Sequence, residues 1–214
     1  FGNDHIGHGE SSLPEDYGFF GEKNGYRHLI ADLHRMTIIV KEKYPNLPVF
    51  LFGHSMGSLA VRSFTKRYDA IINGLIVCGS PSRNPATGAG RMLARVIASI
   101  KGDRHRPSLI HKIAFENFNS RFVSEGENAW LSTDRTIVKE YNDDPLCGYM
   151  FTANGFTGLF DLMLDTYSDK GWNVGNPSLP IHFVAGADDP CITSCKDFDK
   201  AVGHIRSVGY AKVT

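Results

Sequence analysis

The stretch Val49-Phe50-Leu51-Phe52-Gly53-His54-Ser55-Met56-Gly57 decides the fold of this 214-residue chain. The apolar run 49–52 predicts a short buried strand, and residues 58–67 predict a helix. The two glycines allow the backbone to turn sharply and let the helix approach the strand closely. A strand, a G-x-S-x-G turn and a helix in this order form a nucleophile elbow, which exposes the serine hydroxyl at the carboxyl end of the strand.

The elbow assigns two candidate catalytic groups. Ser55 is the predicted nucleophile, because the turn would push its hydroxyl out of the sheet edge. The backbone amide of Met56 lies at the start of the predicted helix, where the helix dipole is positive, and is predicted to stabilise an oxyanion. Five-residue patterns of this kind also arise by chance, so the prediction depends on the strand and helix that flank it.

Other segments alternate between strand and helix patterns. The elements predicted from apolar spacing are helix 24–44, strand 49–52, helix 58–68, strand 74–78 and strand 181–185. The strands are continuous apolar runs, as expected for a parallel sheet covered on both faces. Strands alternating with helices predict an α/β fold with a mostly parallel, doubly wound sheet.

Residues 82–179 interrupt this alternation, with three amphipathic helix patterns and no buried strand. We therefore expect three parts: a core from residues 1–81, a helical cap from 82–179, and a second part of the core from 180–214. Long insertions at an active-site edge usually control access, so the cap is predicted to be a lid. The alternative is an elaborate crossover connection with no lid function.

Composition excludes several classes of protein. Lys plus Arg and Asp plus Glu number 23 each, so no net charge favours nucleic acid. No apolar run approaches the roughly 20 residues that cross a bilayer. The four cysteines, Cys78, Cys147, Cys191 and Cys195, do not indicate a disulfide scaffold in a chain of this length. The C-x3-C pair lacks a second pair that would complete a zinc site.

A serine nucleophile needs a base and a carboxylate that orients the base. Strand 181–185 is followed by Gly186-Ala187-Asp188-Asp189-Pro190, so two adjacent carboxylates would lie on the same edge as Ser55. The residue before proline favours extended geometry, which would project Asp189 out of the turn. We predict Asp189 as the acid, although Asp is also common in turns for conformational reasons alone.

The base is harder to find. Downstream of Asp189 the only histidine is His204, in a helical pattern over 196–208 where a packing or solvent-facing role is expected. His54 adjoins Ser55 in sequence, without a geometry for deprotonating it. Residues 210–214 resemble the entry to one more strand, and we expect the catalytic histidine beyond Thr214.

Four blocks together resemble the α/β-hydrolase superfamily, and within it the monoacylglycerol lipase and lysophospholipase branch (serine aminopeptidase S33, or Hydrolase_4, type). The blocks are residues 3–11 (Asn-Asp-His-Ile-Gly-His-Gly-Glu-Ser), 53–58, 143–148 and 186–190. The resemblance implies Ser55 as nucleophile, Asp189 as acid and the Met56 amide as one oxyanion donor. It implies hydrolysis of carboxylic esters of single-chain lipids through a Ser-His-Asp triad and an acyl-enzyme, with no metal or organic cofactor.

The resemblance also implies parts that this chain lacks. The family's first three strands and its second oxyanion donor would precede Phe1, and its base would follow Thr214. We therefore expect a fragment that is inactive as written, with unpaired strand edges. Because the chain begins at Phe1 and not at Met, we expect the natural start to lie upstream, and whether a signal peptide precedes Phe1 is left open. The expected location is cytoplasmic.

Alternatives to this function stay open at this point. A peptidase or a small-ester esterase could use the same triad, and a non-catalytic binding protein could use the same fold. Apolar cap residues could accommodate an acyl chain or pack on the core (Leu93, Ile97, Ile110, Phe151, Phe156, Leu159 and Phe160). If the substrate is a lipid ester, we expect the cap to contact a membrane surface transiently. The sequence does not predict an oligomeric state.

The first loop carries two further patterns. His5-Ile6-Gly7-His8 matches a nucleotide-binding signature of class I aminoacyl-tRNA synthetases, but the accompanying motifs are missing. Asp4, His5, His8 and Glu10 could be imagined as a metal site. A structural role in a glycine-rich turn is the stronger expectation.

Overall fold

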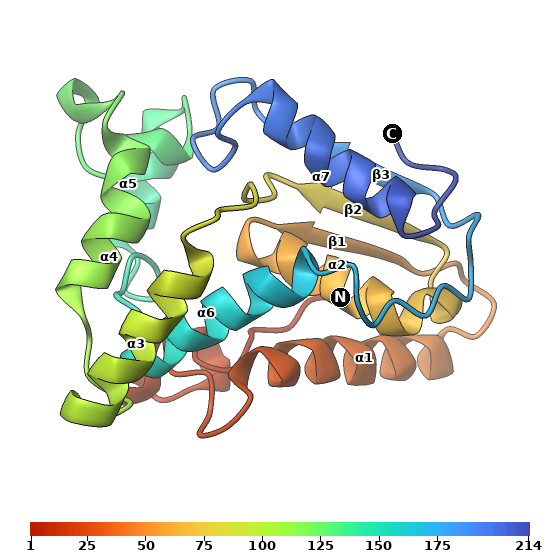
Figure 1. The fold of residues 1–214 in the computed structure, drawn as a ribbon, viewed down its shortest axis with the longest axis horizontal. Helices are drawn as coiled ribbons and strands as arrows, with labels where there is room; N and C mark the ends of the chain where they lie inside the picture. The colour runs from red at the N-terminus through yellow and green to blue at the C-terminus, as the bar shows by residue number, and fades with distance from the viewer. The chain divides into compact units, whose positions relative to one another are not determined.

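The computed structural model describes residues 1–214, with all side chains except those of residues 116 and 117. Three strands form one parallel sheet in the order β1-β2-β3 (Figure 1). The strands are β1 (Phe50–His54), β2 (Gly74–Cys78) and β3 (Ile181–Val184). Their last residues are register partners, His54 with Cys78 and Cys78 with Val184, so the three strands end at one carboxyl edge.

Seven α-helices accompany the sheet: α1 (Gly25–Lys43), α2 (Met56–Tyr68), α3 (Thr87–Lys101), α4 (Ser108–Phe115), α5 (Arg135–Asp143), α6 (Ala153–Thr166) and α7 (Cys195–Ser207). Short 3-10 helices lie at Gly9–Ser11, Pro14–Asp16, Asp69–Ile71, Glu116–Asn119, Val123–Glu125 and Ala129–Leu131. Parallel strands with helices between them confirm the predicted α/β class. None of the described helices is long and apolar enough to cross a bilayer.

The predicted core elements are present, with small shifts in their bounds. Strand 74–78 matches β2, whereas β1 extends two residues past the predicted 49–52. The strand expected to begin near residue 210 is also present as a bridge. Its backbone is bonded to β3 through Ile181 N–H to the Lys212 carbonyl at 2.9 Å and Thr214 N–H to the Ile181 carbonyl at 2.9 Å.

The apolar spacing predicts no helix over residues 153–166, where the structure has α6. Its glycines weaken the helical pattern, because glycine is a poor helix former. The structure explains both of them by packing. A Cβ at Gly155 would stand 1.9 Å from the Gly18 carbonyl oxygen, and one at Gly158 would stand 2.7 Å from Cδ2 of Phe20. The loop at residues 18–20 packs closely against α6. This contact requires glycine at two positions of α6, although glycine has a low helix propensity.

The chain forms two compact units. The first contains residues 1–3, 26–88 and 159–214, and the second contains residues 4–25 and 89–158. The second unit thus combines the first loop with part of the expected cap, while residues 159–179 belong to the unit that holds the sheet. The role of 82–179 as a lid stays a prediction.

Only one face of the sheet is covered within the described residues, although the apolar strands led us to expect cover on both. Val77 and Phe183 are buried, and the Phe198 ring of α7 lies 6.2 Å from the Phe183 ring. On the alternate positions Phe50 and Phe52 are 60% and 62% exposed, because they lie on the uncovered face of the sheet.

Candidate active site

Ser55 occupies a strained turn between β1 and α2. Its φ of 51° and ψ of −119° lie in a region that side-chain-bearing residues rarely adopt. Such a conformation costs about 1–3 kcal/mol and persists only where the surroundings enforce it. Here the Ser55 N–H donates to the Cys78 carbonyl at 3.0 Å, and the Ser58 N–H donates to the Ser55 carbonyl at 3.0 Å. The backbone therefore forms the predicted sharp turn between strand and helix at Ser55.

The Ser55 hydroxyl is not used to cap the helix. Serine at the N-cap commonly accepts a bond from the first turn, but Ser55 makes no such side-chain bond. The Ser58 hydroxyl donates instead to the Ser55 carbonyl, at 2.5 Å. Met56 is the first residue of α2, so its N–H has no acceptor within the helix. A hydroxyl and an unused amide thus lie on adjacent residues, as acyl transfer requires.

The two glycines of the elbow differ in what they permit. A Cβ at Gly53 would stand 2.4 Å from the Gly57 carbonyl oxygen and 2.6 Å from Cγ2 of Val61. Gly53 therefore lets α2 pack against β1. At Gly57 a Cβ would meet nothing within 4 Å, so the expectation that both glycines serve close packing is met at Gly53 and not at Gly57.

The acid turn follows β3 at the same edge of the sheet. Asp189 is half-buried, and its Oδ1 accepts the backbone N–H of Cys191 at 2.9 Å. Asp188 is exposed. The Asp189 N–H donates to the Gly186 carbonyl at 3.2 Å, which closes the turn. The geometry favours Asp189 over Asp188 as the carboxylate facing the protein, and its role as the acid stays a prediction.

Gly79, which directly follows β2, joins the two turns. Its φ is 52°, and a Cβ there would stand 3.0 Å from Asp189 Oδ2 and 3.2 Å from His54 Nε2. The carboxylate and the imidazole of the elbow therefore approach the same point above Gly79. In the sequence Gly79 is marked only as a glycine after strand 74–78, and the residue type alone does not reveal its positive φ.

The negative charge of Asp189 contributes to a raised pKa at two neighbouring cysteines. Burial, followed by the charge of Asp189, raises the pKa of Cys78. Burial, the same charge and a hydrogen bond to Asp189 raise the pKa of Cys191 to about 12. Both cysteines are free thiols that stay protonated at neutral pH, so neither competes with Ser55 as a nucleophile.

His204 packs away from both turns. On α7 its ring lies 6.0 Å from the Tyr167 ring and 5.8 Å from the Trp172 ring, and its Nε2 lies 3.2 Å from Asp169 Oδ1. Burial, and then the charge of Arg62, lower the pKa of His204. A neutral, packed imidazole matches the expected packing role. Within the described chain, Ser55 receives no hydrogen bond from a histidine.

The first loop uses its polar residues to fold itself. Asp4 accepts the Glu10 N–H at 2.9 Å, and the Ser11 hydroxyl donates to the Asp4 carbonyl at 2.8 Å. The His8 ring packs among those of Phe20, Tyr149 and Phe151, which lie 5.5–5.8 Å away. Within the described residues no three His, Cys, Asp or Glu side chains are grouped as a metal site.

A second set of contacts holds the loop that leads away from Gly79. Arg62 on α2 is fully buried, and its Nη1 donates to the Ser80 hydroxyl at 3.1 Å. Its guanidinium carbon lies 4.4 Å from the centre of the Tyr167 ring. The Tyr167 hydroxyl donates to the Pro81 carbonyl at 2.6 Å. The sequence does not predict that Arg62 is buried, because the residues adjacent to it in the chain do not make the contacts that bury it.

Comparisons with known proteins show the family to which this chain belongs. The family model Hydrolase_4, described as serine aminopeptidase, S33, matches residues 1–208. The chain belongs to this hydrolase family. The chain is similar to the monkeypox virus "Monoglyceride lipase homolog", with 39% identity over 160 residues that cover 73% of this chain and 49% of that protein. To the Homo sapiens "Monoglyceride lipase" it is 27% identical over 151 residues, which cover 68% and 42% respectively.

Solved structures agree on the fold. A carboxyl esterase from Bacillus coagulans, crystallised in complex with glycerol, is 25% identical with a TM-score of 0.86 over 99% of this chain and 69% of its own. A lipase in its open form is 21% identical with a TM-score of 0.81. These likenesses confirm the α/β-hydrolase fold, and the family match and the curated relatives confirm the resemblance to the monoacylglycerol lipase branch. This Hydrolase_4 chain spans less than half the length of the curated relatives named above.

Proposed function

We propose that this chain carries the nucleophile and the acid of a serine hydrolase that cleaves carboxylic esters of single-chain lipids, either monoacylglycerols or lysophospholipids. The observation that carries the proposal is the Ser55 turn, in which a strained serine leaves its hydroxyl free of helix capping beside the unused Met56 amide. Family membership supports a serine hydrolase, and the names of the curated relatives support a lipid ester as substrate.

The roles follow from this arrangement. Ser55 Oγ attacks the ester carbonyl, and the Met56 N–H stabilises the oxyanion that forms. A histidine outside residues 1–214 takes the serine proton and passes it to the leaving alcohol, while Asp189 orients that histidine. Water then attacks the acyl-enzyme and releases the fatty acid. A second oxyanion donor is also proposed to come from outside these residues.

The test uses the protein encoded by the complete gene. Fluorophosphonate labelling and hydrolysis of 1-oleoylglycerol should both be abolished by Ser55→Ala. Asp189→Asn should lower kcat by about 10⁴-fold, as loss of the orienting carboxylate does in serine hydrolases. Asp188→Asn is the matched control and should stay within about twofold of wild type, because its side chain is exposed. Labelling that survives Ser55→Ala would refute the proposal.

The isolated chain is proposed to be inactive. Without a base, the Ser55 hydroxyl keeps its proton and attacks esters poorly. Purified residues 1–214 should therefore hydrolyse 4-nitrophenyl esters no faster in wild type than in Ser55→Ala. A rate that depends on Ser55 in this chain would contradict this proposal while leaving Ser55 as nucleophile.

A peptidase is the second candidate, since the matching family model is described as a serine aminopeptidase. An esterase for small acyl groups would use the same residues. Activity profiles with glyceryl esters, nitrophenyl esters of increasing chain length and aminoacyl amides separate these functions. The absence of any histidine after residue 214 in the complete gene would favour a non-catalytic binding protein.

We also propose that the cap contacts membrane surfaces transiently. On α3, Met92, Val96 and Ile100 follow i, i+4, i+8 spacing and are 66%, 46% and 76% exposed, so they form an apolar stripe. Such a stripe can enter the boundary between head groups and acyl chains. Co-sedimentation with phosphatidylcholine vesicles should weaken in Met92→Ser/Ile100→Ser and stay unchanged in Ile137→Ser, an equally apolar change on α5.

A further inference from the structure

Residues 79–82 (Gly-Ser-Pro-Ser), which follow β2, contact helix α2 on one side and the Asp189 turn on the other. This segment is called the strap below. Both of its serines are buried. The strap, α2, the end of α6 and the Asp189 turn all belong to the unit that holds the sheet. The contacts that join them therefore lie within one compact unit.

Tyr167 holds the strap from the side of α2. It directly follows α6, and the hydroxyl of the preceding Thr166 donates to the Leu59 carbonyl of α2 at 3.1 Å. The guanidinium carbon of Arg62, also on α2, lies 4.4 Å from the centre of the Tyr167 ring. The Tyr167 hydroxyl donates to the Pro81 carbonyl at 2.6 Å. Because proline has no N–H, this carbonyl is the only backbone group of Pro81 that can form a hydrogen bond.

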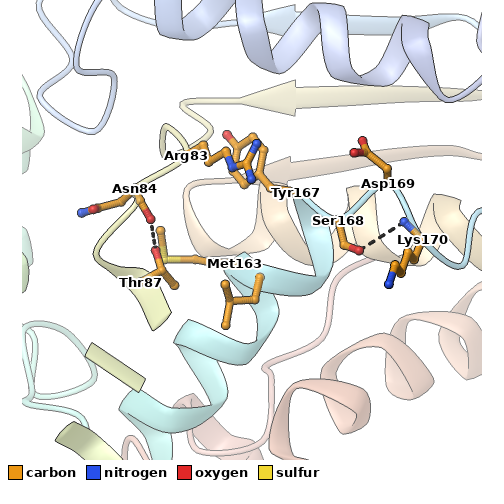
Figure 2. A pocket seen from close by; sticks show the side chains of 9 residues that line it. Arg83, Asn84, Thr87, Met163, Tyr167, Ser168, Asp169 and Lys170 are labelled. Atoms are coloured by element: carbon orange, nitrogen blue, oxygen red, sulfur yellow. Dashed lines mark hydrogen bonds between the residues drawn. The ribbon is translucent and has the colours of Figure 1, made fainter. Parts of the chain in front are cut away.

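Arg62 holds the strap at the neighbouring residue. Its Nη1 donates to the Ser80 hydroxyl at 3.1 Å, and its guanidinium carbon lies 5.7 Å from the centre of the Phe183 ring on β3. The guanidinium is thus placed by two aromatic rings. Tyr167 also lines a pocket of about 330 Å³, where Figure 2 shows its ring at the end of α6. Because the pocket leaves space beside this ring, the hydroxyl bond and the stacking on Arg62 are the contacts that direct Tyr167 to the strap.

On its other side the strap is bonded to the turn that carries Asp189. The Ser82 N–H donates to the Cys191 carbonyl at 3.1 Å, and the Ser82 hydroxyl accepts the Thr193 N–H at 3.2 Å. The N–H of Cys191 in turn donates to Asp189 Oδ1 at 2.9 Å. A Cβ at Gly79 would stand 3.0 Å from Asp189 Oδ2. The strap therefore contacts the residue that fixes one carboxylate oxygen and lies beside the other oxygen.

We propose that Tyr167 is a positioning residue for Asp189, on which it acts through the strap. The inference rests on the proposed hydrolase, in which Asp189 orients the histidine. Helix α2 begins directly after Ser55 and also places Tyr167, so one helix sets the positions of both the nucleophile and the acid. A misplacement of about 1 Å in a catalytic group can cost on the order of 10²-fold in rate, so loss of the Tyr167 hydroxyl reaches the chemistry.

Alkylation of Cys191 by iodoacetamide in the purified chain, followed by peptide mass spectrometry, tests the strap without catalysis. Cys191 is buried, so its thiol reacts when the Asp189 turn opens. Tyr167→Phe should raise the rate about fivefold, as expected for loss of one hydrogen bond. Tyr210→Phe is the matched control and should stay within twofold, because the Tyr210 hydroxyl donates to Asp69 Oδ2 at 2.9 Å, just past the far end of α2. An unchanged rate in Tyr167→Phe, or an equal rise in both variants, would overturn the proposal.

Hydrolysis of 1-oleoylglycerol by the protein encoded by the complete gene tests the effect on the acid. Tyr167→Phe should lower kcat about tenfold and leave KM within twofold of wild type. In an Asp189→Asn background the same change should alter kcat less than twofold, because the group that Tyr167 positions is already lost. A tenfold loss in both backgrounds, or no loss in either, would overturn the positioning role. If fluorophosphonate labelling survives Ser55→Ala, the proposed hydrolase fails, while alkylation of Cys191 still decides whether Tyr167 holds the turn.

Discussion

Helix α2 is held by backbone geometry at its first turn and by buried charge in its last two turns. At the first turn, Ser55 is strained, Gly53 admits the helix to the strand, and Ser58 bonds back to the Ser55 carbonyl. These contacts lie between residues 53 and 61, and the bond from the Ser55 N–H to the Cys78 carbonyl adds one from the neighbouring strand. Ser55 is therefore held by contacts that involve no ionisable side chain.

The other end depends on Asp165, which lies about 100 residues further along the chain. Arg67 donates to both carboxylate oxygens, at 3.0 and 3.1 Å, and the Ser63 hydroxyl donates to Oδ2. Lys66 is 1% exposed and donates to the Asp165 and Ser168 carbonyls at 2.7 and 3.2 Å. The comparison teaches that one helix can begin in a turn held by uncharged contacts and end in a clamp held by charged side chains.

Gly53→Ala should have the largest effect. The added Cβ would stand 2.4 Å from a backbone oxygen of α2, which cannot move without displacing the whole first turn. We expect the free energy of unfolding to fall by about 3 kcal/mol, at the upper end of overpacking effects. Urea denaturation followed by circular dichroism measures the change, and a loss below about 1 kcal/mol would contradict the close packing of β1 and α2.

Asp165→Asn should come next, with a loss of about 2 kcal/mol at pH 7 for breaking a half-buried charged network. Burial alone would raise the pKa of Asp165, but hydrogen bonds from Arg67 and Ser63 outweigh it and lower the pKa. The stability that this carboxylate contributes is therefore present above its unfolded pKa of about 3.9 and is lost as pH falls through the lower folded value.

Urea denaturation at pH 7, 5, 4 and 3 tests the sign of this effect. The difference between wild type and Asp165→Asn should be constant from pH 7 to 5 and shrink below about pH 4. Asp188→Asn, an exposed carboxylate, should show no difference at any of these values. A difference that persists undiminished at pH 3 would show that Asp165 acts through shape and not through charge.

The same contrast explains what the sequence predicts. The elbow is readable because Gly53, Ser55 and the flanking strand and helix lie within about twenty residues. The acid was assigned to Asp189 because Pro190 restricts its backbone. By contrast, nothing adjacent to Arg62 or Lys66 marks them as buried, since their contacts come from residues 80 and 165–168. Helix α6 was missed for a related reason, because its glycines serve contacts with a distant loop.

Ser58→Ala should have a smaller effect, a loss of about 1 kcal/mol from removing one buried hydrogen bond to the Ser55 carbonyl. Ser99→Ala is a matched control, because the Ser99 hydroxyl makes the same i to i−3 bond to the Val96 carbonyl at 2.8 Å on an exposed part of α3. Thermal unfolding of both variants checks the difference. Equal effects would mean that the bond does not support the elbow.

Gly57→Ala should have the smallest effect and the opposite sign. Its Cβ would meet nothing within 4 Å, and alanine favours helix over glycine by up to about 1 kcal/mol. We expect the free energy of unfolding to rise by about 0.5 kcal/mol, measured by urea denaturation beside Gly53→Ala. A fall would show that the first turn of α2 is tighter than its geometry indicates. A rise would mean that the open space above Gly57, one residue from the Met56 amide, is not needed for the folding of the elbow.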